Sequence, residues 1–112
     1  MELLEKYMKI TAWNNGLKSK TGSGYGFRIS AKDRDKYFKK EWSFVIVNLP
    51  GINKQIEINI KKNSFWNDTC VELISKEIGK WLQSNKFAPW QKGKPPKFKL
   101  ENIRKNEFQI II

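Results

Sequence analysis

The chain has 112 residues, with 22 Lys and Arg against 11 Asp and Glu, no histidine and a formal net charge of +11. A small domain needs a net charge of magnitude roughly 2 to 8 for solubility, and this chain exceeds that range. The excess indicates a polyanionic binding partner, and nucleic acid is the leading candidate. One cysteine excludes an internal disulfide and, without histidine, a Cys/His zinc site, and no run approaches the roughly 18 apolar residues of a membrane span.

These limits predict a single cytoplasmic domain over residues 1–112 that contacts no membrane and uses no cofactor. The aromatic content of 13% favours a folded core over a disordered basic tail. The alternative explanation of the charge is a composition that is rich in Lys, Asn and Ile throughout the chain.

The first forty residues predict two strands and a short helix. Residues 7–13 alternate between the two sides of a strand, and residues 14–16 (Asn-Asn-Gly) mark a turn before a small, polar and basic connection. A second strand is expected at about 25–29. Residues 30–33 resemble a capping box with Asp in place of Glu, which predicts a helix of two or three turns that reaches residue 40.

The middle of the chain predicts a hairpin followed by a long helix. Residues 42–49 are apolar at nearly every position, which is typical of a central strand covered on both faces. Residues 55–61 alternate strictly, so one face should meet the core, and these two segments should pair. From residue 67 to 84 the apolar positions recur at the spacing of an amphipathic helix, and Cys70 is expected on its buried face.

Two further strands, at 97–102 and 107–112, alternate around a turn at 104–106. The order ββαββαββ predicts an α+β domain whose mostly antiparallel sheet or open pseudobarrel has about six short strands and two helices. This order resembles that of the pseudobarrel DNA-recognition domains of some restriction-type proteins. The resemblance is one of topology and implies no residue roles.

A basic loop at 86–97 is the first candidate binding segment. From Lys86 to Lys99 the chain has five lysines and no acidic residue. We expect Lys92, Lys94 and Lys97 to neutralise phosphates, and Trp90 to stack on an unpaired base or to wedge into a base step. The alternative is a solvated loop in which Trp90 packs on the core.

A second basic loop, at 14–24, contains Lys18 and Lys20 before three glycines at the spacing G-x-G-x-G. Glycines at this spacing allow backbone N–H groups to approach a phosphate. The motif leads into a strand and lacks the spacing of a dinucleotide or nucleotide-triphosphate loop, so a nucleotide cofactor is not expected. The alternative is a loop without a ligand.

Three arginines stand among 19 lysines. Arginine contacts guanine through two hydrogen bonds, which lysine does less well, so Arg28 and Arg104 are candidates for base reading. Arg34 lies between Asp33 and Asp35 and is expected to hold a helix terminus instead.

Together these features predict a nucleic-acid-binding module, with DNA favoured over RNA, in which the two loops form opposite rims of a groove above residues 55–59. A first alternative is a small histidine-free nuclease or a ribonuclease-type toxin. Glu57, Asn59 and Lys61 share a strand face, at a spacing similar to the E-x-K of metal-dependent nucleases. A second alternative is an interaction protein that binds an acidic partner.

Overall fold

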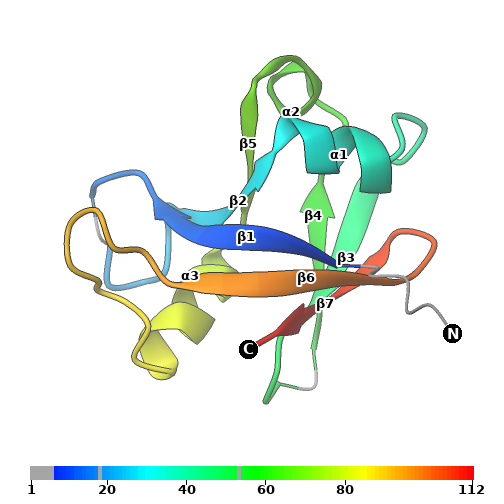
Figure 1. Cartoon of the computed structure of the whole chain (residues 1–112). Helices are drawn as coiled ribbons and strands as arrows, with labels where there is room; N and C mark the ends of the chain where they lie inside the picture. Colours follow the sequence, from blue (N-terminus) through cyan, green and yellow to red (C-terminus); the bar gives the residue numbers. More distant parts are fainter. Residues whose placement is uncertain (1–6, 18, 53) are drawn as a thin grey trace, which may run out of the picture.

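One mixed sheet, nearly closed into a barrel, organises the molecule (Figure 1). The structure is a computed structural model and describes residues 7–17, 19–52 and 54–112. The strands of this part of the chain are β1 (Tyr7–Asn14), β2 (Tyr25–Ser30), β3 (Phe44–Asn48), β4 (Gln55–Asn59), β5 (Cys70–Ile74), β6 (Lys97–Arg104) and β7 (Glu107–Ile111). The helices are α1 (Ala31–Tyr37), α2 (Asn63–Asn67) and α3 (Lys76–Ser84). Across the sheet the strands follow the order β4-β3-β7-β6-β1-β2-β5.

The pairing confirms the predicted fold class. Within the described residues every neighbouring pair of strands is antiparallel except β3 and β7, which are parallel. The expected hairpin is present, because β3 pairs with β4 from Phe44 opposite Asn59 to Asn48 opposite Gln55. Strand β3 has a neighbour on each side, as predicted, but its outward residues are only partly covered. The domain has one strand and one helix more than we expected.

The extra strand lies within the segment that was predicted as one helix over 67–84, and the extra helix, α2, begins before that segment. The prediction is right for α3 and wrong for the residues that form β5. Strand β5 lies there between α2 and α3 and pairs with β2 along its whole length. Val71 and Leu73 are buried at alternate positions, while Ile74 is exposed. Cys70, Leu73 and Ile74 also fit a helical spacing, so the pattern was ambiguous, and the hydrogen-bonded ladder with β2 decides in favour of a strand. Cys70 therefore begins a strand and does not lie on a helix face.

Serine caps begin two of the helices. Ser30 accepts a hydrogen bond from the backbone N–H of Asp33 at 3.2 Å, which confirms the predicted start of α1, although the helix ends earlier than predicted, at Tyr37. Ser75 accepts one from the backbone N–H of Glu77 at 3.2 Å and starts α3. Each cap satisfies one of the free N–H groups at a helix start. The cap at Ser75 is the signal that separates β5 from α3.

Alternation along the strands separates the core from the outer face of the sheet. On β1 and β6 the buried positions carry Met8, Ile10, Phe98 and Leu100 among others, and the residues between them turn outward. Since directly opposite residues on antiparallel strands point to the same side, lysines on neighbouring strands come together on the outer face. This outer face proves more informative than the loops.

Candidate nucleic-acid interface

The two predicted basic loops lie at one end of the barrel (Figure 1). Loop 14–24 rests on α3, where Gln83 Nε2 donates to the carbonyl of Ser19 at 2.8 Å. Loop 86–97 follows α3 and rejoins the sheet where the N–H of Ala12 donates to the carbonyl of Pro96 at 2.9 Å. Strands β3, β7 and β6 separate β4 from β1, so the predicted groove with β4 as its floor is wrong. The two loops share this end of the barrel.

Two glycines of the G-x-G-x-G motif, one in loop 14–24 and one in β2, have packing roles. A Cβ on Gly22 would lie 2.5 Å from the carbonyl oxygen of Lys76 in α3, and the residue has a φ of +89°, which favours glycine. A Cβ on Gly26 would lie 2.3 Å from the carbonyl oxygen of Leu73 in β5. Close approach of α3 and β5 therefore accounts for these two glycines, as the alternative without a ligand requires.

Loop 86–97 is anchored by its tryptophan. Trp90 is partly buried and packs edge-on against Tyr25, with ring centroids 5.9 Å apart. This placement agrees with the core-packing alternative, and a stacking role for Trp90 stays a prediction. Lys92 and Lys94 are exposed in a turn, where the N–H of Lys94 donates to the carbonyl of Gln91 at 2.9 Å. Their side chains face solvent beside the point where the loop enters β6.

The other predicted site residues divide between the two ends of the barrel. Arg28 is half exposed, and its Nε donates to Glu72 Oε2 at 3.0 Å. Arg104 lies at the far end of β6, roughly 23 Å from Lys97 at about 3.3 Å per residue, and its Nη1 contacts Glu107 Oε1 at 2.9 Å. Lys20 is exposed in its loop, and Lys18 lies outside the described residues.

Arg34 is a structural residue, as predicted. Its side chain is buried, and Nη1 donates to the carbonyls of Phe65 at 2.9 Å and Asp68 at 2.8 Å, while Nε donates to Asp35 Oδ1 at 3.0 Å. The guanidinium thus satisfies carbonyls at the end of α2 and ties them to α1. It is not available to a ligand.

The structure brings Lys97 and Arg28, which the sequence predicted as site residues, together with Lys9 and Lys99, which were not predicted. On the outer face, Lys9 of β1 is directly opposite Lys99 of β6, and Thr11 of β1 lies between Lys97 of β6 and Arg28 of β2. We call these five residues the basic sheet face. All except Thr11, which is partly buried, are exposed. The alternation of β1 and of β6 is visible in the sequence, but the register that places Lys9 beside Lys99 is not.

Charge on the basic sheet face is poorly balanced. Arg28 has Glu72 opposite it on β5, but Lys9 faces another lysine and Lys97 faces a threonine. Like charges directly opposite one another destabilise a sheet, by a few tenths of a kcal/mol up to about 1 kcal/mol. A bound polyanion would reduce this repulsion between like charges.

Aromatic side chains flank these cations along β1. Tyr7 and Trp13 point to the same outer side as Lys9 and are partly buried. Lys99 Nζ lies 4.6 Å from the centroid of the Tyr7 ring, a cation–π contact that holds this ring. Trp13 is opposite Gly26 of β2, which places no side chain beside the indole. The outer face therefore combines cations with two aromatic rings, the pairing of groups that single-stranded nucleic acid requires.

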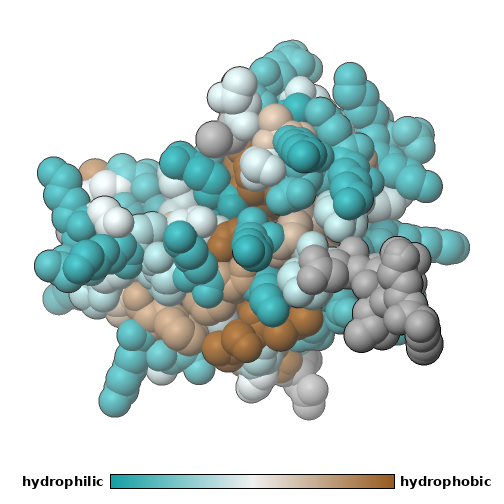
Figure 2. Space-filling model, in the orientation of Figure 1, coloured by the Kyte–Doolittle hydropathy of each residue, from teal (hydrophilic) through white to brown (hydrophobic). Residues whose placement is uncertain are grey.

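An apolar hollow of about 390 Å³ opens beside the basic sheet face. It is lined by residues of β1, β6 and β7 and the residue after β7, namely Lys9, Lys97, Phe98, Lys99, Ile111 and Ile112. Figure 2 shows hydrophobic surface bordered by hydrophilic side chains in the area where the end of β7 lies in Figure 1. Its lining combines three lysines with apolar residues.

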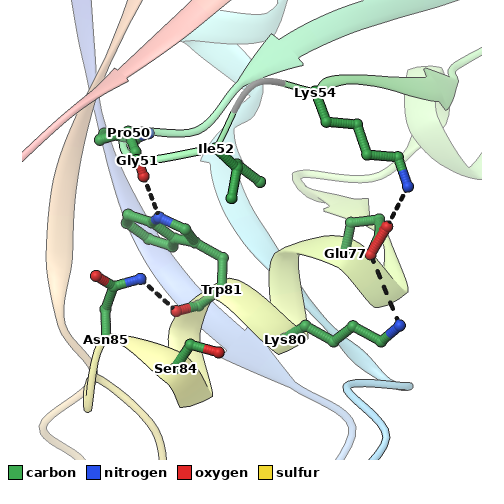
Figure 3. Close-up of a pocket in the computed structure, with 9 residues that line it drawn as sticks. All are labelled: Pro50, Gly51, Ile52, Lys54, Glu77, Lys80, Trp81, Ser84 and Asn85. Carbon is green, nitrogen blue, oxygen red and sulfur yellow. Dashed lines mark hydrogen bonds and ion pairs between the residues drawn. The ribbon is translucent and has the colours of Figure 1, made fainter.

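A larger groove, of about 570 Å³, lies between α3 and the β3–β4 connection (Figure 3). Trp81 Nε1 donates to the carbonyl of Pro50 at 2.8 Å, and Glu77 accepts a hydrogen bond from Lys54 at 2.5 Å and lies 3.9 Å from Lys80. The hydrogen bond from Lys54 and the nearby lysine charges lower the pKa of Glu77. The charged groups of this groove contact one another.

Nothing in the described structure assembles a metal centre for the nuclease alternative. Among residues 7–17, 19–52 and 54–112, no three His, Cys, Asp or Glu side chains are grouped so as to hold a metal ion. Glu57 is exposed on the outer side of β4, at an edge of the sheet. In the same part of the chain, no helix is long and apolar enough to cross a membrane.

Comparisons with known protein families, with curated proteins and with solved structures found no match to this chain. The function must therefore be argued from the site itself.

Proposed function

We propose that the protein binds nucleic acid through the basic sheet face and the adjoining basic loops. The observation that carries the proposal is the direct juxtaposition of Lys9 and Lys99 across β1 and β6, with Lys97 and Arg28 in the next row. Phosphates are the ligand groups that this density of cations fits best, because each neutralised phosphate also releases counterions. Lys20, Lys92 and Lys94 extend the cationic surface toward the loops.

In this proposal the lysines position the ligand and carry little sequence information, since they reach phosphates and not base edges. Arg28 can leave Glu72 to read a base, whereas Arg104 lies too far along β6 to share the same contact region. DNA remains the favoured ligand over RNA, on the sequence-based expectation, and both are included in the test.

The test removes three lysines from the basic sheet face and compares a variant with the same net charge. Lys9, Lys97 and Lys99 are replaced by Ala in one variant, and the exposed Lys32, Lys36 and Lys39 in or next to α1 are replaced in the other. Fluorescence anisotropy with labelled DNA and RNA oligonucleotides is measured over a salt series. We expect the log–log salt slope to fall by about 2 to 3 in the first variant and by much less in the control.

Two results would contradict the proposal. Equal losses in both variants would mean that only total charge matters, and absence of binding to DNA and RNA at low salt would remove nucleic acid as the ligand. A saturable complex with one acidic protein would then favour the interaction-protein alternative. Cleavage of the oligonucleotides by the wild type but not by a Glu57→Ala variant would favour the nuclease alternative.

A further inference from the structure

Resting on the proposed function, we infer that the ligand is a single strand and that the hollow between β1, β6 and β7 receives one of its unpaired bases. The hollow adjoins the basic sheet face, because Lys9, Lys97 and Lys99 belong to both. The hollow supplies apolar surface, and the basic sheet face supplies positive charge. A base inside the hollow would leave its flanking phosphates at the lysine rim. Such an arrangement uses the apolar and the charged parts of a nucleotide at the same time.

The lining of the hollow suits single strands better than duplexes. Ile111 is partly buried and Ile112 exposed, and the side-chain carbon that they present offers no hydrogen-bonding group to a base edge. In a duplex the base faces are stacked and only their edges are accessible in the grooves. In a single strand the base faces are free, and they gain by contact with apolar or aromatic surfaces. The hollow therefore suits a base that is not paired.

The aromatic rings on β1 extend the same argument along the strand. Tyr7 and Trp13 are six residues apart on one side of β1, a span of roughly 20 Å at about 3.3 Å per residue. The cations of the basic sheet face lie between the two rings. This order of ring, cations and ring matches an extended chain that carries bases and phosphates in turn, and it places the hollow beside the middle of the path.

The groove beneath α3 is larger but supports no comparable proposal. Its cations Lys54 and Lys80 both contact Glu77, and the indole N–H of Trp81 is already bonded to Pro50 (Figure 3). The hollow beside β7 has the opposite character, because none of its lysines faces a carboxylate directly across the sheet among the described pairs. Charge complementarity thus selects the smaller site.

The experiment alters the apolar part of the hollow without changing the charge. Ile111→Ser removes carbon from the lining, and Ile103→Ser makes the same change at an exposed position at the other end of β6. Binding is measured with a 20-nucleotide single strand of thymidine, with the matching RNA of uridine and with a 20-base-pair duplex. We expect Ile111→Ser to weaken single-strand binding by about 5- to 100-fold and to leave duplex binding and the salt slope unchanged.

A second pair of variants tests the stacking path. Trp13→Leu keeps an apolar side chain over Gly26 but removes the ring, whereas Trp13→Phe restores a ring. We expect the leucine variant to lose single-strand affinity and the phenylalanine variant to recover most of it, with equal unfolding midpoints in urea as evidence that both variants fold. Loss in both variants, or in neither, would contradict a stacking role.

The outcomes separate this inference from the proposed function. If duplex and single strand bind equally, Ile111→Ser has no effect and the triple-lysine variant still loses affinity, the inference fails and the proposed function stands. If no nucleic acid binds at low salt, both fail. Vesicles of phosphatidylserine and phosphatidylcholine form a further arm, and vesicle binding that depends on Ile111 without single-strand binding would assign the hollow to an acyl chain and overturn the inference.

Discussion

Two charged surfaces of this molecule are built in opposite ways. Around α3, Glu77 lies between Lys54 and Lys80, and each of these cations contacts its carboxylate. On the basic sheet face, Lys9 and Lys99 are directly opposite one another and share no carboxylate across the strands. The lysines of the first surface are paired with a carboxylate within the fold, whereas Lys9 and Lys99 of the second have no carboxylate directly opposite them.

This difference indicates which charged surface of a basic protein is the better candidate for a binding site. Paired charges on a surface have small effects on stability and need no further explanation. Cations that strand register holds side by side repel one another and lower the stability of the free protein. This repulsion falls when an anion binds. The following variants test whether α3 serves stability and the basic sheet face serves binding.

Gly79→Ala should have the largest effect, and on stability alone. A Cβ on Gly79 would lie 2.0 Å from the carbonyl oxygen of Gly22, so α3 would have to move away from loop 14–24. We expect the free energy of unfolding to fall by about 3 kcal/mol, as for overpacking of a tight contact. Urea unfolding measures the change, and Ser84→Ala on the same helix is the control. A neutral result would show that the loop does not hold α3.

Trp81→Phe should have the next largest effect. The variant loses the hydrogen bond from the indole N–H to the carbonyl of Pro50 and some buried volume. We expect a loss of about 2 kcal/mol in the free energy of unfolding, with oligonucleotide affinity unchanged under conditions where the variant is folded. A marked loss of affinity at full folding would break the comparison, because it would involve the α3 groove in binding.

Lys9→Glu should move stability and binding in opposite directions. The new carboxylate would be directly opposite Lys99 on β6, so the free energy of unfolding should rise by about 0.2 to 1 kcal/mol. Oligonucleotide affinity should fall, because one cation of the basic sheet face becomes an anion. Parallel urea unfolding and anisotropy measurements, with Lys32→Glu as the matched charge control, would show this. A fall in both quantities would mean that Lys9 is a structural residue.

Glu77→Gln should have the smallest effect, confined to stability and dependent on pH. Because lysine neighbours lower the pKa of Glu77, its ionised form favours the folded state above the unfolded pKa of about 4.5, and this contribution is lost as pH falls. Glu77 is only partly buried, so solvent screening keeps the contribution small. We expect the small advantage of wild type over the variant in urea midpoint at pH 7 to disappear as the pH falls below the unfolded pKa. An advantage that grows on acidification would contradict the assigned shift.

Strand alternation made much of the fold predictable. The strict pattern at 55–61 and the apolar run at 42–49 correctly predicted the β3–β4 hairpin, because local alternation reports which side of a strand is buried. The segment from Cys70 to Ile74 was assigned to a helix because its apolar spacing fits both periods. Its pairing with β2, which lies 40 to 48 residues earlier in the chain, identifies it as a strand.

The candidate site was harder to predict for a related reason. The sequence shows that Lys97 and Lys99 alternate with buried residues, and that Lys9 does the same on β1. Nothing local states that these strands pair, or in which register, since the partners are ninety residues apart. Charge density along the chain therefore indicated the loops as the binding site, whereas the register of two distant strands brings cations together on the sheet.

The position of β7 has a consequence for how the chain matures. This strand is the last in the sequence, yet it lies between β3 and β6 and forms the parallel pair with β3. Until residues 107–111 emerge from the ribosome, the β3–β4 hairpin pairs with no strand of the β6-β1-β2-β5 half among the described residues, and β3 and β6 present open edges. Open strand edges invite pairing with other chains, so nascent forms that lack β7 are the ones most exposed to aggregation.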